Sequence, residues 1–109
     1  MKKFLVLYRS SVTAGEQMGG GTPEEAQAGM ELWMTWAGKA GDRLVDLGSP
    51  LASVKTIGSG ASGQPIGGFS ILQAETADEI SELLEDHPHF HSPGDPSIEV
   101  LEFLPIPGM

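Results

Sequence analysis

Residues 66 to 84 read I-G-G-F-S-I-L-Q-A-E-T-A-D-E-I-S-E-L-L, a strand pattern followed directly by a helix pattern. Within residues 66–74, apolar side chains fall on both sides of the chain, which is typical of a strand covered on two faces. Thr76 and Glu79 then form a capping box, in which a hydroxyl and a carboxylate each satisfy a free backbone N–H at a helix start. The stretch therefore predicts a strand over 66–74 and a helix that begins at Thr76 and is broken by Pro88.

The preceding part of the chain predicts a strand and a helix in the same order. Residues 4–8 are an apolar and aromatic run that suits a strand, whereas the small, Gly-rich residues 10–21 predict a loop. Thr22 and Glu25 repeat the capping box. The helix after Thr22 is expected to end at Gly41 and to bury one stripe, made of Ala26, Met30, Trp33, Ala37 and Ala40.

Three further strand candidates complete the order of elements. Residues 43–47 and 54–57 flank a break at Gly48-Ser49-Pro50, residues 58–65 predict the tip of a hairpin, and residues 98–103 form the last apolar run. With the two short segments on either side of the break counted as one strand, the order is strand, helix, two strands, helix, strand, which is the split β-α-β, ferredoxin-like pattern. It is an α+β fold in which both helices cover one face of an antiparallel sheet.

The predicted helices leave the second face of this sheet bare, although its strands are apolar on both sides. In the first strand, Leu5 and Leu7 point away from Phe4 and Val6. Burying a large apolar side chain contributes roughly 1.5–3 kcal/mol, so a whole face left in water would forgo much of the available stability. We therefore expect a second copy of the chain to cover it. The resulting homodimer would hold a small-molecule pocket between sheet, helix and partner.

Composition excludes several classes of protein. At 109 residues the chain is expected to form one domain over residues 1–109. Its 15 acidic and 6 basic residues give a net charge of −9, so neither nucleic acid nor an anionic membrane is an expected partner. The absence of cysteine excludes disulfides and thiolate metal sites. No stretch approaches the roughly 20 apolar residues that cross a bilayer, and the first apolar run stops at Arg9, so a cytoplasmic location is expected.

Three segments resemble the YCII-related proteins, including their DGPF branch. They are residues 67–89 (G-G-F-S-I-L-Q-A-E-T-A-D-E-I-S-E-L-L-E-D-H-P-H), residues 97–103 (S-I-E-V-L-E-F) and residues 40–51 (A-G-D-R-L-V-D-L-G-S-P-L). The resemblance implies a dimeric α+β barrel built on a ferredoxin-like sheet. For the members suspected of catalysis, it also implies a histidine on the first helix with an aspartate nearby.

This chain departs from that catalytic pattern. The matching helix position lies close to Met30, no histidine precedes His87, and the Asp-Gly-Pro-Phe signature is absent. Asp46, the nearest carboxylate to the matched turn, has no partner that the sequence identifies. The acid-base pair of the family is therefore not carried over to this chain.

All three histidines, His87, His89 and His91, fall within five positions. Their rings could converge on a cation only in backbone conformations that no periodicity supports, so neither a metal site nor a cofactor is expected. For acid-base catalysis the candidates are His89 and His91, with Asp95 or Asp86 to orient a ring. The structural alternative places His87 in the last helical turn, and His89 and His91 as solvated residues of the link to the last strand.

Three aromatic residues are candidate ligand contacts: Tyr8, Trp33 and Trp36. Aromatic residues on strands and helices more often pack in a core. The leading hypothesis is a YCII-like homodimer that binds a small organic molecule. If it is an enzyme, it would transfer protons on a ring compound, as in isomerisation or elimination, and this class comes from fold analogy alone. The alternative is a protein- or metabolite-binding module without catalysis, which the missing helix-one histidine favours.

Overall fold

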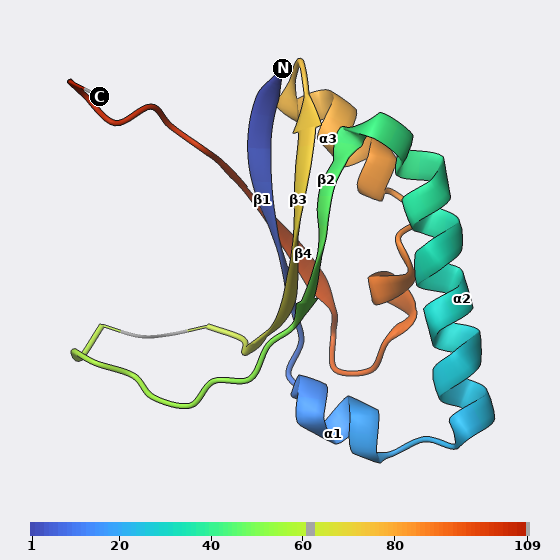
Figure 1. Cartoon of the computed structure of the whole chain (residues 1–109). Helices are drawn as coiled ribbons and strands as arrows, with labels where there is room; N and C mark the ends of the chain where they lie inside the picture. The colour runs from blue at the N-terminus through green and yellow to red at the C-terminus, as the bar shows by residue number, and fades with distance from the viewer. Residues whose placement is uncertain (61–62, 109) are drawn as a thin grey trace.

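The computed structural model describes residues 1–60 and 63–108. Four strands form one sheet in the order β2-β3-β1-β4, and all neighbouring strands are antiparallel. This order and the helices on one face confirm the predicted α+β, ferredoxin-like fold (Figure 1). The strands are β1 (Lys2–Arg9), β2 (Leu44–Pro50), β3 (Ile66–Ala74) and β4 (Ser97–Glu102).

Two longer helices, α2 (Pro23–Ala40) and α3 (Ala77–Leu84), lie on one side of the sheet (Figure 1). Both begin at the predicted capping residues, because Thr22 Oγ1 accepts from Glu25 N at 3.1 Å and Thr76 Oγ1 accepts from Glu79 N at 3.3 Å. The core fills the space between these helices and the sheet. It consists of Phe4, Val6, Tyr8, Trp36, Ala40, Leu72, Ala74, Ile80, Leu83 and Leu84.

The predicted apolar stripe of α2 is only half right. Ala40 is buried, and Trp33 and Ala37 pack partly against the core, but Ala26 and Met30 are exposed. A helix of 18 residues is about 27 Å long, and only its C-terminal half meets the core residues. The N-terminal half therefore leaves its apolar side chains accessible.

The loop predicted over residues 10–21 contains a short helix, α1 (Ala14–Gly19). Thr13 caps it, accepting from Glu16 N at 3.2 Å, while its hydroxyl donates to the Glu16 carboxylate at 3.1 Å. The prediction was wrong because the glycines on either side hid a third Thr-x-x-Glu pattern. Two short 3₁₀ turns, η1 (Gly41–Arg43) and η2 (Pro88–His91), complete the elements.

The strand predicted over residues 54–57 is absent, and β2 instead continues through Gly48 to Pro50. Asp46 Oδ1 accepts from Gly48 N at 2.8 Å, and the pairing with β3 shifts register on both sides of Asp46. With these irregularities in its backbone, β2 continues through Gly48-Ser49-Pro50, where the sequence predicted a break. Val54 and Ile57 are 94% and 90% exposed, with no strand beside them among the described residues.

The sheet face away from the helices carries a row of apolar side chains. Leu5 lies opposite Ile71 on β3 and Leu101 on β4, and Leu7 lies opposite Phe69. In the single chain these residues are half-buried, and Leu101 is 41% exposed. No described helix is both long enough and apolar enough to span a membrane.

Gly48 marks the tightest backbone approach in the sheet. Its φ is 87°, and a Cβ at this position would lie 1.6 Å from the carbonyl oxygen of Phe69. Any side chain would therefore push β2 away from β3. Glycine is required here by space as well as by backbone conformation.

Replacing Gly48 with Ala should lower the free energy of unfolding by more than about 3 kcal/mol, because strain and a backbone clash add together. Gly58→Ala is the matched control, since Gly58 has a similar φ of 93° and no described atom within 4 Å of its would-be Cβ. The control should lose only about 1–2 kcal/mol. Urea denaturation measures both, and equal losses would show that the approach to Phe69 imposes no constraint.

Candidate functional site

His87 is the most unusual polar residue of the structure, because it is completely buried. The helix before it stops at Leu84, and Pro88 holds His87 in an extended conformation with φ −60° and ψ 140°. The His87 side chain then caps η2, with Nδ1 accepting from His89 N at 2.9 Å. This local turn directs the ring into the core instead of leaving it on the helix end, where the sequence predicted it.

Three aromatic rings surround the His87 imidazole. Tyr8 stacks on it with ring centroids 4.9 Å apart at 27°. Trp33 and Trp36 meet it edge to face, at centroid distances of 4.5 and 4.4 Å and interplanar angles of 84° and 66°. Tyr8 comes from β1 and both tryptophans from α2. We call these four residues the aromatic box.

The second ring nitrogen of His87 has no hydrogen-bond partner among the described groups. Because Nδ1 is an acceptor, the neutral ring carries its proton on Nε2, so a buried N–H is left as an unpaired donor. The perpendicular tryptophan rings offer it at most weak N–H···π contacts. A buried donor left without an acceptor costs about 1–3 kcal/mol, so the protein keeps it at a loss of stability.

Burial lowers the pKa of His87 from 6.5 to about 3, because the charged ring would lose its hydration inside the aromatic box. The nearby His89 lowers this pKa further, and Asp86 opposes the shift. His87 is consequently neutral at pH 7. It offers a hydrogen-bond donor and does not exchange protons readily at that pH.

Tyr8 is likewise held in its neutral form. Its hydroxyl donates to Ser70 Oγ at 2.8 Å, and Ser70 in turn donates to the carbonyl oxygen of Leu47 at 2.6 Å. Burial raises the pKa of Tyr8 to about 12, although the hydrogen bond with Ser70 opposes the shift. The box therefore contains no charge at neutral pH. No sequence pattern indicated Ser70, whose two partners lie on β1 and β2.

His89 holds two strand ends together. Its Nε2 lies 2.9 Å from the carbonyl oxygen of Arg9, at the end of β1, and 3.1 Å from that of Ser97, at the start of β4. Since both carbonyls are acceptors, Nε2 carries a proton that they share. The same corner is packed closely, because a Cβ on Gly94 would lie 2.5 Å from Ser10 Oγ. These are the contacts of a structural residue.

The structure does not assemble the predicted catalytic group. His91 and Asp95 are exposed, and among the described residues no hydrogen bond joins any two of His89, His91 and Asp95. The alternative of solvated histidines describes His91 but not His87 or His89, which are buried. In the described ranges no three histidine, aspartate or glutamate side chains are placed to hold a metal ion.

The structure does bring the predicted ligand contacts Tyr8, Trp33 and Trp36 together, with His87 at their centre. The prediction missed His87 as the central residue. Its spacing carried the signal, because His87 follows Ile80, Leu83 and Leu84 at helical spacing in the sequence and all four are buried.

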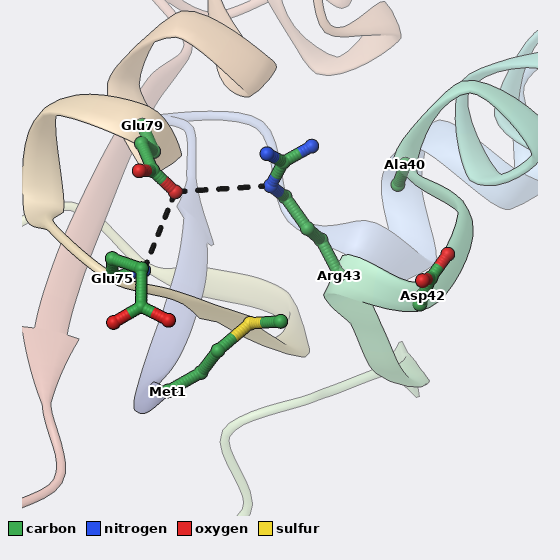
Figure 2. A pocket seen from close by; sticks show the side chains of 6 residues that line it. All are labelled: Met1, Ala40, Asp42, Arg43, Glu75 and Glu79. Carbon is green, nitrogen blue, oxygen red and sulfur yellow. Dashed lines mark hydrogen bonds and ion pairs between the residues drawn. The ribbon is translucent and has the colours of Figure 1, made fainter.

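Two surface hollows lie outside the aromatic box. One, of about 240 Å³, is lined by Met1, Ala40, Asp42, Arg43, Glu75 and Glu79 (Figure 2). There Glu79 Oε2 accepts from Glu75 N at 3.3 Å and lies 3.9 Å from Arg43 Nε, which are the contacts of a helix cap (Figure 2). The other, of about 320 Å³, lies between α3, η2 and β4 and is lined by Ser81, Leu84, Glu85, Phe90, Ile98 and Val100.

Comparison with known proteins adds little to this geometry. No family model and no curated protein match the chain, so the YCII resemblance stays a prediction. One similar solved structure is a 5-chloro-2-hydroxyhydroquinone dehydrochlorinase from Burkholderia phenoliruptrix AC1100, in complex with 2,5-dihydroxybenzoquinone. It shares 18% identity over 89% of this chain and 90% of that chain, with a TM-score of 0.48. At these values the likeness carries no argument about activity.

Acid should destabilise the protein through His87. The unfolded chain takes up a proton near the ordinary pKa of 6.5, whereas the folded chain does so only near pH 3. The stability is therefore complete above pH 6.5 and falls by up to about 1.4 kcal/mol per pH unit as the pH drops from 6.5 toward 3.

His87→Asn tests this, because asparagine keeps an acceptor for His89 N but does not titrate. Urea denaturation across this pH range should give a flatter pH dependence for the variant than for the original protein. Parallel curves would contradict the assignment of the acid sensitivity to His87.

His89→Ala should lower the free energy of unfolding by about 2–3 kcal/mol, because it leaves the Arg9 and Ser97 carbonyls without their shared donor. His91→Ala, which changes an exposed side chain two residues away, should change it by less than about 0.5 kcal/mol. Thermal unfolding of both variants measures the difference. Similar values for the two would show that His89 does not secure the strand ends.

Proposed function

We propose that this chain is a homodimeric module that binds a small, planar, uncharged organic molecule in the aromatic box. The observation that carries the proposal is the unpaired Nε2–H of His87, which is fully buried and ringed by Tyr8, Trp33 and Trp36. A donor kept at a cost in stability marks a place where an acceptor from outside the chain would be stabilising.

The surroundings define the chemistry of the ligand. Flat rings on three sides favour another flat ring, and the single free donor favours one carbonyl or phenol oxygen on it. A charged ligand is disfavoured, because His87 and Tyr8 are neutral and the four residues of the box offer an ion no opposite charge. An aromatic or quinonoid carbonyl compound meets these conditions.

Access to His87 requires one ring to move, and Trp33 is the candidate. Trp36 is fixed by a hydrogen bond from its indole N–H to the Leu83 carbonyl at 3.1 Å, whereas Trp33 is half-buried and is held by ring contacts with Tyr8 and His87. Met30, one helical turn before Trp33, is 59% exposed, so α2 is open to solvent at that turn. A rotation of Trp33 would open the box toward the N-terminal half of α2.

Binding without turnover fits these groups better than acid-base catalysis. Neutral His87 and protonated Tyr8 both donate hydrogen bonds at pH 7, and neither transfers a proton readily there. His89 holds its proton on Nε2 between the Arg9 and Ser97 carbonyls, and its basic nitrogen, Nδ1, lies 3.4 Å from the Ser92 hydroxyl. An isomerase-like activity in the box would therefore need a base other than His87 and Tyr8.

The dimer is supported by the bare face of the sheet. Leu5, Leu7, Phe69, Ile71 and Leu101 form a continuous apolar row across three strands. A self-complementary contact with a second copy would bury this row, as closed two-fold interfaces do.

Benzaldehyde and toluene test the binding site, because they have the same ring but only benzaldehyde has an acceptor oxygen. In titrations followed by the His87 Nε2–H proton resonance, benzaldehyde should shift the signal and bind roughly tenfold more tightly than toluene, the equivalent of one hydrogen bond. No shift with either compound would overturn the proposed site.

His87→Phe supplies the matched variant, since it keeps a flat ring and removes the donor. Followed by tryptophan fluorescence, this variant should bind both compounds with similar affinity, provided its circular dichroism matches that of the original protein. An undiminished preference for benzaldehyde would show that another group recognises the oxygen.

A further inference from the structure

Two segments leave the sheet on the side away from the helices. Residues 51–60 link β2 toward β3, and residues 103–108 follow β4 (Figure 1). We call them the hairpin arm and the C-terminal arm. Figure 1 shows both arms extending beyond the bare face of the sheet, one near each end of the strands.

Apart from Met1, the four most exposed large apolar side chains of the described residues lie in the arms. Val54 and Ile57 of the hairpin arm are 94% and 90% exposed, and Leu104 and Ile106 of the C-terminal arm are 74% and 63% exposed. Single exposed apolar residues are ordinary on protein surfaces. Two groups of them flanking an apolar sheet face are characteristic of an interaction surface.

The accessible surface area of the single chain indicates how much surface a partner could cover. The chain exposes 7427 Å², whereas a folded monomer of 11.5 kDa exposes about 5,800 Å². The excess of roughly 1,600 Å² is about twice the 800 Å² that one partner buries in a standard interface. The arms also raise the radius of gyration to 14.9 Å, against about 13 Å for a compact chain of this length.

The charge distribution favours a second copy of this chain as the partner. Although the chain has 15 acidic residues, residues 47–74 contain none, and neither do residues 103–109. On β4 both glutamates are paired with β1 cations, Glu99 with Arg9 at 2.9 Å and Glu102 with Lys2 at 3.9 Å. Two copies with a net charge of −9 each can therefore approach most favourably with these sides facing.

We infer that the two arms clasp a second copy of this chain, each closing over the partner on either side of the paired sheet faces. The inference rests on the homodimer of the proposed function. It adds that the dimer interface extends from the sheet face onto the two arms. It assigns Val54, Ile57, Leu104 and Ile106 to the interface, although none of them belongs to a strand. A clasp of this kind would bury much of the excess surface.

Single-cysteine variants can test the clasp directly, because the chain has no cysteine of its own. The arm variants are Ile57→Cys and Ile106→Cys. The control is Met34→Cys on α2, which is 54% exposed on the helix side. Reaction with a maleimide should slow by at least about tenfold for both arm thiols as protein concentration passes from monomer to dimer, with no change for the control. Arm thiols that react equally fast in both states would overturn the clasp.

Sedimentation equilibrium tests the clasp and the dimer as two distinct hypotheses. Val54→Ser/Ile57→Ser and Leu104→Ser/Ile106→Ser should each raise the dimer dissociation constant by at least about tenfold, whereas Met30→Ser/Met34→Ser should leave it unchanged. Leu101→Glu, in the bare face, should give monomer. If Leu101→Glu is monomeric but the arm variants dimerise normally, the clasp is wrong and the dimer stands. If the original chain is monomeric at micromolar concentration, both are wrong.

Discussion

A sheet that is apolar on both faces, with helices on only one, is the constraint on which the rest of this structure depends. The covered face supplies the core, in which Phe4 and Val6 of β1 and Leu72 of β3 meet α2 and α3. The uncovered face cannot be satisfied within the chain, since no described element is left to lie over it. The arms, the low charge of that side and the proposed dimer all follow from this imbalance.

The aromatic box places a polar ring inside the covered face of the sheet. A polar ring in the core is tolerated because Pro88 ends the helical path and one imidazole nitrogen caps the next turn. The other nitrogen receives nothing from the chain. The proposed binding role of His87 rests on this imbalance, in a core where Tyr8 and Ser70 pair their polar groups.

The sequence predicted the elements whose signals are local and left out those that depend on distant contacts. The capping patterns at Thr22 and Thr76 placed both long helices, and the apolar residues on both sides of 66–74 placed β3. The strand at 54–57 was wrong because β2 continues to Pro50 by pairing with Phe69 and Gly68 of β3, which are distant in the sequence.

The candidate site was predictable only in its components. Tyr8, Trp33 and Trp36 were identified as aromatic candidates, but their meeting at His87 depends on the packing of β1 against α2 and on the turn at Pro88. The role of His89 could not be predicted either, because its acceptors, Arg9 and Ser97, are backbone carbonyls. The position of the charges also affects how fast two copies meet. Residues 47–74 carry no carboxylate, but the 15 carboxylates elsewhere in each copy repel the other copy at long range. Added salt shortens the reach of that repulsion to about 8–10 Å at physiological ionic strength, so two copies should encounter each other faster in salt than in dilute buffer.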